Sequence, residues 1–347
     1  MRGTWRLLCV CLLLMVTHGL HAQSGFSLME NPTAKKIDIT YDGKLVTAYC
    51  YFDSTEKPVL FPVKTLSGLT VTRGYPVAPR VGERTDHPHQ LGLWFNYEDV
   101  NGLDFWNNSS AIEAARKDKY GSVKHQRVLS KFAEGKKATL STLSHWVNQG
   151  GDVLLEETTT FTFLASGQDI IIDRKCELKA VAKKVVFRDV KDGLIAIRVA
   201  RSLEMPSEQK SRFIDANGRE TTESAVNSEG VTGMYVNREG NTGDAVWSSK
   251  SIWVQLYGTV QESPVAIIII DHPSNPGYPA YWHARGYGLF GANPLGRAIF
   301  SKGKEALNLT ISRGERVEFR YRFIIHDGNQ MSHDEIDSFM KDFHSLR

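Results

Sequence analysis

The sequence is poor in the features that mark membrane-embedded, disulfide-rich and nucleotide-binding proteins. Only 4 of its 347 residues are cysteine. Its one long apolar run, residues 7–16, is shorter than the about 20 residues that a membrane-spanning helix needs. Basic and acidic residues nearly balance, at 42 and 39, so there is no basic surface field for nucleic acid. We therefore expect no nucleic-acid partner and no stable membrane insertion.

Several catalytic signatures are also missing. The chain has no Walker loop, no dinucleotide fingerprint, no Cys-x-x-Cys pair and no Gly-x-Ser-x-Gly elbow. These absences argue against ATP-dependent, NAD-dependent and ordinary serine-hydrolase chemistry.

The N-terminus has the pattern of a secretory signal. Arg2 and Arg6 precede the apolar run, and the small residue Ala22 follows it. This order predicts a signal peptide over residues 1–22 and a periplasmic or secreted mature protein. Cleavage would leave Cys50 and Cys176 in an oxidising compartment, where a disulfide and two buried free thiols are both open.

Most of the remaining chain alternates between apolar and polar residues, which is typical of strands. Residues 37–41 and 45–52 flank Asp42-Gly43, the strongest short-range hairpin signal. Further strand-like runs cover residues 122–133, 138–147, 153–164, 170–178, 184–190, 194–199, 252–257, 264–270, 307–311 and 316–325. With no alternation of strands and helices, we expect an all-β protein, a large antiparallel β-sandwich.

Two helices and one long loop complete the expected architecture. A capping box at residues 332–335 and apolar residues at helical spacing predict a closing C-terminal α-helix near 333–345. A shorter helix is expected to start at Ser110. Residues 204–244 are polar and glycine-rich, which predicts a long loop that either forms one wall of a cleft or is only solvated. We expect a single domain over residues 23–347.

The first histidine cluster is Asp86-His87-Pro88-His89. An extended segment would place His87 and His89 on one face, where they could converge on a ligand or only hold a loop. Trp94 and Trp106 follow and could flank a sugar ring, or be core residues. Asp104 stands between them, where apolar surroundings would raise its pKa towards that of an acid catalyst.

The second cluster follows the apolar strand 265–270. Asp271 and His272 stand at its end, before a loop with three prolines. Farther on, Trp282 precedes His283, and an extended backbone would place His283 and Arg285 on one face as a proton carrier beside a fixed cation. Arg285 could instead pair with a structural aspartate.

Two further polar residues lie near apolar strands. Arg198 ends the apolar run 194–197, so it requires either a buried ion-pair partner or a place in a pocket wall. Asn293 follows the expected strand 287–291 and could contribute an amide to the same cavity.

Four segments resemble one known family. Residues 85–95 (TDHPHQLGLWF), 99–106 (DVNGLDFW), 271–276 (DHPSNP) and 282–296 (WHARGYGLFGANPLG) resemble, in this order, the PmoA-like family of secreted bacterial proteins. Gln90 and Leu91 stand where the usual family pattern has His and Arg. The resemblance implies a galactose-mutarotase-like supersandwich and a setting in exported carbohydrate degradation.

These observations favour an exported carbohydrate-active enzyme of the hydrolase, lyase or epimerase class that acts on a glycoside or modified sugar by histidine-assisted acid/base chemistry. The expected catalytic residues are His89, His283, Asp104 and Asp271. The expected substrate-binding residues are His87, Trp94, Trp106, Arg198, His272, Trp282, Arg285 and Asn293. No cofactor is needed.

Two alternatives remain open from the sequence. A hydrolytic or oxidative metal site would use Zn or Cu, held by His87, His89, His272 and His283. A non-catalytic sugar-binding protein would use the tryptophans and arginines only to bind.

Overall fold

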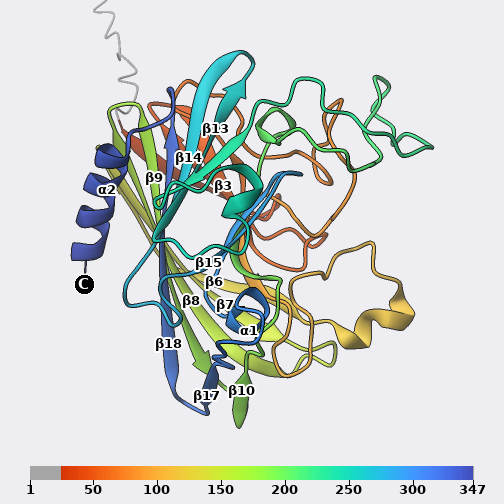
Figure 1. The fold of residues 1–347 in the computed structure, drawn as a ribbon. Coiled ribbons are helices and arrows are strands. Elements are labelled where there is room, and N and C mark those ends of the chain that lie inside the picture. Colours follow the sequence, from red (N-terminus) through yellow and green to blue (C-terminus); the bar gives the residue numbers. More distant parts are fainter. Residues whose placement is uncertain (1–24, 347) are drawn as a thin grey trace, which may run out of the picture.

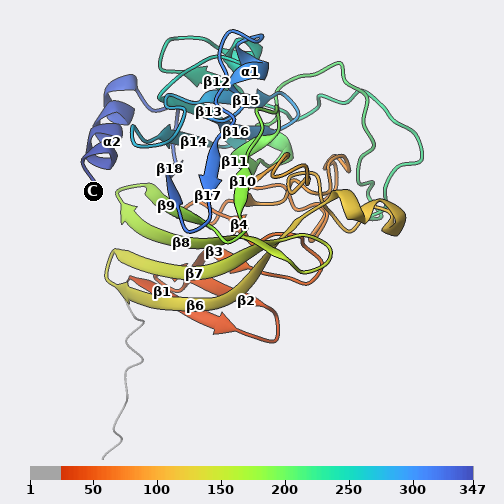
Figure 2. The ribbon, with the colours of Figure 1, turned by 90° about the horizontal axis from the view of Figure 1, so that it is seen from below.

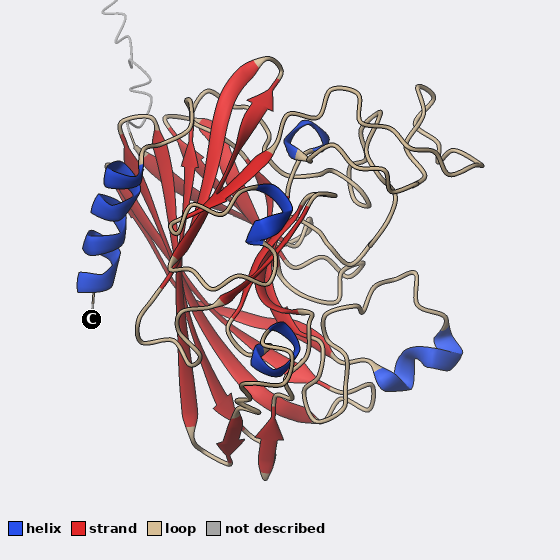
Figure 3. Cartoon of the chain, in the orientation of Figure 1, coloured by secondary structure: helices blue, strands red, loops and turns tan. Residues whose placement is uncertain are grey.

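The computed structural model describes residues 25–346, which form mainly strands (Figures 1 and 3). One eight-stranded antiparallel sheet has the order β1 (Phe26–Asn31), β2 (Lys36–Tyr41), β3 (Lys44–Cys50), β4 (Val59–Val63), β5 (Leu93–Tyr97), β11 (Gly193–Arg198), β16 (Leu289–Asn293), β15 (Tyr281–Arg285). The second has the order β12 (Met234–Asn237), β13 (Trp253–Val260), β14 (Ser263–Asp271), β18 (Arg316–His326), β9 (Asp169–Ala180), β8 (Val153–Ser166), β7 (Lys137–Val147), β6 (Ser122–Glu134).

The two sheets pack face to face, with β6 next to β1 where the layers meet (Figure 2). Alternate residues of the strands point into the space between the sheets, as the period of two requires. Phe95 of the first sheet and Phe319 of the second approach to 5.7 Å between ring centres in this core. The expected all-β class, a large antiparallel sandwich, is confirmed.

The C-terminal helix α2 (His333–Ser345) covers the outer face of the second sheet (Figure 1). Its apolar stripe, with Ile336, Met340 and Phe343, packs on isoleucines of β9, β14 and β18. Ser332 and Glu335 form the expected capping box, so the closing helix begins and ends as predicted.

The remaining elements are short. They are the two-stranded sheet of β10 (Lys184–Val186) and β17 (Thr310–Ser312), the helix α1 (Arg297–Phe300), and the 3-10 helices η1 (Ala114–Lys119), η2 (Arg201–Leu203) and η3 (Gly243–Val246). The helix expected from Ser110 is therefore only η1. The expected loop over 204–244 contains β12 and part of η3, and it otherwise projects from the side of the molecule away from α2 (Figure 1).

Three further expectations have different outcomes. The predicted signal peptide, residues 1–22, lies outside the described residues. Cys50 and Cys176 are both buried free thiols in separate apolar clusters, so they do not pair. Within residues 25–346, no helix is both long and apolar enough to cross a membrane.

Candidate functional site

A row of four residues crosses the outer face of the first sheet. Trp94 on β5 pairs with Ala196 on β11, Ala196 pairs with Gly291 on β16, and Gly291 pairs with His283 on β15. The first and last are large, while the two in the middle are the smallest side chains available. The two smallest side chains of the row therefore lie between Trp94 and His283, where Ala196 packs in the apolar cluster of Trp94.

Close backbone packing leaves no room for a side chain at Gly291. A Cβ atom at position 291 would lie 2.9 Å from the Cβ of Ala196 and 2.9 Å from the carbonyl oxygen of Ile195. Such contacts are closer than packed atoms tolerate, so only glycine fits between the two neighbouring strands. The close approach of β11 and β16 at this point is therefore a fixed feature of the sheet.

The segment with His87 and His89 is a turn beside this face of the first sheet. The amide of Gln90 donates to the His87 carbonyl at 2.9 Å, and His87 has a left-handed backbone with φ of 45°. The expectation of an extended segment is therefore wrong, because Pro88 occupies a turn position that its fixed φ also suits. The two imidazole rings nevertheless lie 5.6 Å apart.

One buried guanidinium holds the backbone of this turn. Arg73 donates to the carbonyls of Arg84, Asp86, His87 and Gln90 at 2.8 to 3.2 Å. Its side chain is only 1% exposed. The turn is thus fixed from below by a side chain that follows β4 in the chain.

Asp86 connects the turn to the sheet. Its Oδ1 accepts hydrogen bonds from Arg73 at 2.8 Å and from Arg198 at 2.7 Å. Burial alone would raise the pKa of Asp86, but the charges of Arg198 and Arg73 hold it well below its usual range. Arg198 therefore has the buried ion-pair partner that its place on an apolar strand requires.

Tyr287 links the turn to the second histidine segment. The His87 ring stacks on the Tyr287 ring at 5.0 Å, and the guanidinium groups of Arg198 and Arg285 lie 4.9 and 5.9 Å from the same ring. After burial and the charge of Lys191, the charge of Arg285 also lowers the pKa of His283. Two segments almost 200 residues apart thus meet in one place.

His283 faces a carboxylate. Its Nδ1 lies 3.6 Å from Oδ1 of Asp192, which precedes β11. Burial is the main reason that the pKa of His283 falls to about 3, and that the pKa of Asp192 rises. His283 is therefore a neutral imidazole near pH 7, and the Asp192 carboxylate lies next to it without a hydrogen bond between them.

Two more carboxyl groups lie near Asp192. The Glu98 carboxylate accepts from the Asp192 amide at 3.3 Å, and burial followed by the charges of Asp192 and Asp104 raises the pKa of Glu98 to about 7. Asp104 accepts two hydrogen bonds from Asn107, and burial raises its pKa as expected. This side of the site can therefore hold a proton near neutral pH.

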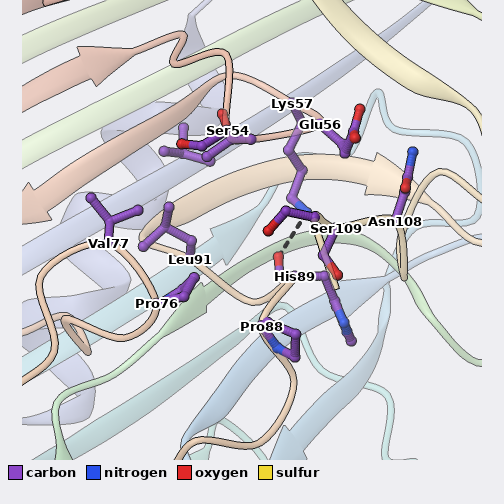
Figure 4. Close-up of a pocket in the computed structure, with 13 residues that line it drawn as sticks. Ser54, Glu56, Lys57, Pro76, Val77, Pro88, His89, Leu91, Asn108 and Ser109 are labelled. Carbon is purple, nitrogen blue, oxygen red and sulfur yellow. Dashed lines mark hydrogen bonds between the residues drawn. The ribbon is translucent and has the colours of Figure 1, made fainter. Parts of the chain in front are cut away.

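On the other side, a cavity of about 290 Å³ lies beside His89 (Figure 4). The buried Lys57 lines it and donates to the His89 carbonyl at 2.7 Å, and its Nζ lies 5.6 Å from the Trp94 ring. Burial lowers the pKa of Lys57 to about 7. In Figure 4 the His89 ring points away from Lys57.

Several buried polar atoms of this region have no hydrogen-bond partner within the described chain. They are His87 Nδ1, His89 Nε2, Trp94 Nε1, Asn96 Oδ1, Arg198 Nε and His283 Nδ1. Because buried polar atoms are normally satisfied, such a cluster indicates a place for a polar ligand or ordered water. Donors and acceptors are mixed, which suits hydroxyl groups.

The tryptophans do not form the walls that we expected. Trp94 and Trp106 pack on each other at 5.1 Å with 0% and 1% of their surfaces exposed, so no indole face is open. Trp282 points into the core between the sheets, because it alternates with His283 along β15. The exposed aromatic residue of this region is Trp247, whose ring lies 5.3 Å from Arg285.

Asn293 also has another role than substrate binding. Its amide donates to the carbonyls of Val190 and Lys191, and its oxygen accepts from the amides of Leu295 and Gly296. The side chain is fully used in holding the loop that leads to Asp192.

Asp271 and His272 lie outside the site. The Asp271 carboxylate accepts hydrogen bonds only from its own loop, residues 272–280, and His272 packs on Phe343 and His344 of the α2 helix. The strand β14 that carries them belongs to the second sheet, whereas the row of Trp94 and His283 lies on the outer face of the first. The alternative metal set loses His272 for this reason, and nowhere in residues 25–346 do three His, Cys, Asp or Glu side chains gather as metal ligands.

The sequence did not point to Glu98, Asp192, Lys57, Arg73 or Tyr287. Asp192 and Glu98 stand next to turns, where exposed acidic residues are common. The available signal was the buried strand that follows Asp192, since a carboxylate at such a strand end is carried to the sheet face.

Comparisons with known proteins complete this description. Curated proteins give no match. Among solved structures, the galactosidase domain of the α-galactosidase–sucrose kinase AgaSK is 11% identical with a TM-score of 0.41, over 87% of this chain and 42% of that one. Galactose 1-epimerase from Lactobacillus acidophilus NCFM is 11% identical with a TM-score of 0.37, over 89% of this chain and 100% of its own. The GH36 α-galactosidase AgaB from Geobacillus stearothermophilus is 11% identical with a TM-score of 0.35, over 87% of this chain and 41% of its own.

The chain spans less than half of the length of these two galactosidase structures. All three likenesses are distant, and they transfer no activity to this chain. The expected resemblance to the PmoA-like family stays a prediction. The sequence matches a family of unknown function over residues 36–341, and the chain therefore belongs to that family, DUF6807.

Proposed function

We propose that this protein is a carbohydrate-active enzyme of the hydrolase, lyase or epimerase class, which transfers protons at a sugar bound beside the histidine turn on the outer face of the first sheet. The observation that carries the proposal is the stacking of His87 on Tyr287, which brings the two histidine segments together around unpartnered buried polar atoms. A ligand rich in hydroxyl groups offers both donors and acceptors to such atoms.

The residues divide into a base side and an acid side. His283 is neutral and accepts a proton, while Asp192 next to the ring stabilises the imidazolium that forms. Glu98, with a pKa of about 7, keeps a proton to donate to an oxygen of the sugar. His87 and His89 bind the ligand from the turn.

The test is turnover by the chain from Gln23 onward on a panel of glycosides and free sugars, followed by proton NMR of the anomeric and unsaturated signals. His283→Asn is expected to lower kcat by about 10²- to 10⁴-fold, the usual contribution of a positioned acid or base. His145→Asn, on β7 of the second sheet, is the matched control and should keep full activity.

Unchanged turnover in His283→Asn would overturn the proposal. Binding of a sugar without any product would instead identify a sugar-binding protein.

We also propose that the chain is exported, because residues 1–22 have the pattern of a signal peptide. Mass spectrometry of the protein from its native host should then find Gln23 as the first residue.

A further inference from the structure

A second cavity, of about 460 Å³, opens next to the proposed site. Arg285 and Tyr287 line it, together with Trp247 beyond η3 and part of the loop that follows η2. His87 of the histidine turn stacks on Tyr287 of this cavity, while His89 of the same turn lines the cavity of Lys57.

Arg285 is a partly buried cation whose charged group is held by aromatic rings. Its guanidinium lies 5.3 Å from the Trp247 ring and 5.9 Å from the Tyr287 ring. Within residues 25–346 its side chain makes no ion pair and no hydrogen bond, whereas the guanidinium groups of Arg73 and Arg198 are bound to Asp86. Stacking on rings leaves the N–H groups at the edge of the guanidinium free to donate.

We propose that Arg285 binds the negatively charged substituent of an acidic sugar, a uronate carboxylate or a sulfate ester. This inference rests on the proposed function, because it names the substrate class of the same site. A guanidinium presents parallel N–H donors that match two oxygens of either group.

The spacing along β15 places the cavity of Arg285 next to His283. Arg285 and His283 are two residues apart on one strand, so their side chains share a face about 7 Å apart. That gap is about the width of a pyranose ring with its substituent. His283 is only 2% exposed and does not itself line the cavity, so a charged group held by Arg285 would place the ring in the cavity, next to the buried His283.

Two acidic residues of the cavity oppose such a ligand. Asp244 and Glu208 also line it, but both are exposed, where water and salt screen their charges. Arg285 lies deeper, where a charge interacts more strongly. Removal of the Asp244 charge should therefore strengthen the binding of acidic sugars.

The experiment measures binding by calorimetry on the His283→Asn background, so that turnover plays no part. The probes are galacturonate, galactose 6-sulfate and neutral galactose, with matching oligosaccharides. We expect the acidic probes to bind more tightly than galactose, and Arg285→Gln to weaken the acidic probes by about 10- to 100-fold while galactose changes little. Asp244→Asn should strengthen them several-fold, and Arg316→Gln, an exposed arginine on β18, should change nothing.

Preference for galacturonate over the sulfate, or the reverse, identifies the charged group. Three results would each overturn the proposal. They are equal binding of acidic and neutral probes, no binding of any acidic probe, and an unchanged preference for acidic probes in Arg285→Gln. Should Arg285→Gln fail to fold, the affinity of the His283→Asn protein for the acidic probes should still fall as salt rises, and a salt-independent affinity would contradict the inference. If the unmodified protein binds the acidic probes but turns over none of them, the proposed enzymatic function is overturned and this inference remains valid.

Discussion

At the scale of single residues, the site separates its proton acceptor from its proton donor by environment. Burial lowers the pKa of His283 to about 3 and raises that of Glu98 to about 7. Removing water disfavours the charged form of each group, so the histidine loses its proton and the glutamate keeps one. Near pH 6 the neutral imidazole and the protonated carboxyl group therefore coexist.

The pH profile of the enzyme should report this arrangement. We expect kcat/KM to fall as pH rises through about 7, because Glu98 then loses the proton that it donates. Below pH 7 the activity should hold until His283 is protonated, towards pH 3. Measurement of initial rates from pH 4 to 9 checks the decline above pH 7 and the absence of a second decline down to pH 4.

Glu98→Gln should lower kcat and remove the decline above pH 7, since an amide has no proton to lose in this range. The matched control is Glu156→Gln, a partly exposed glutamate paired with Lys179 on the second sheet, which should keep the profile. If the decline above pH 7 persists in Glu98→Gln, it is caused by the titration of a group other than Glu98.

The buried ion pair of Arg198 makes a separate prediction about stability. Arg198→Met leaves Asp86 with one arginine instead of two, and breaking a buried pair costs about 3–5 kcal/mol. Urea unfolding of the variant should show this loss in the free energy of unfolding. Arg316→Met, which breaks an exposed pair with Glu177, should lose less than about 1 kcal/mol.

At the scale of elements, alternation and capping were enough to predict most strands and the closing helix. The same alternation could have excluded Trp282, because a residue next to His283 on a strand must face the other side of the sheet. The turn at His87 could not be predicted in this way, since a proline suits both an extended segment and a turn. Its conformation depends on Arg73, which is a contact between distant parts of the chain.

One methyl group at Gly291 would disturb the row of residues on β5, β11, β16 and β15. Gly291→Ala would place its Cβ 2.9 Å from the Cβ of Ala196, so we expect a loss of about 1–3 kcal/mol in the free energy of unfolding and a loss of turnover. Thermal melting and the NMR assay measure the two effects. Gly150→Ala, in a turn of the second sheet where the nearest contact is a side chain, should change neither, and full activity in Gly291→Ala would show that the spacing of β11 and β16 does not matter for turnover.

At the scale of the whole molecule, the sequence predicted the class of fold but not which distant segments meet. Strand runs follow from local patterns, whereas the order of the first sheet places β5, β11, β16 and β15 side by side from three separate parts of the chain. That order brings His87 and Asp192 near His283 and leaves Asp271 on the other sheet. Pairing between distant strands is decided by the packing of all of them together.

The whole molecule should be indifferent to reducing agents. Cys50 and Cys176 are free and buried, so the chain from Gln23 onward should show two thiols only after denaturation, measured with a thiol reagent. Its melting temperature should not change with dithiothreitol. A shift on reduction, or fewer than two thiols in denaturant, would contradict the separate placement of the two residues.

The dependence of the histidine turn on Arg73 has a consequence for protein engineering. Four carbonyl groups between residues 84 and 90 converge on this one side chain. A transplant of the heptapeptide into another β-sandwich would therefore lose its shape unless a guanidinium came with it from the segment that follows β4. Laboratory recombination of related sequences should accordingly succeed when both parts are inherited from one parent.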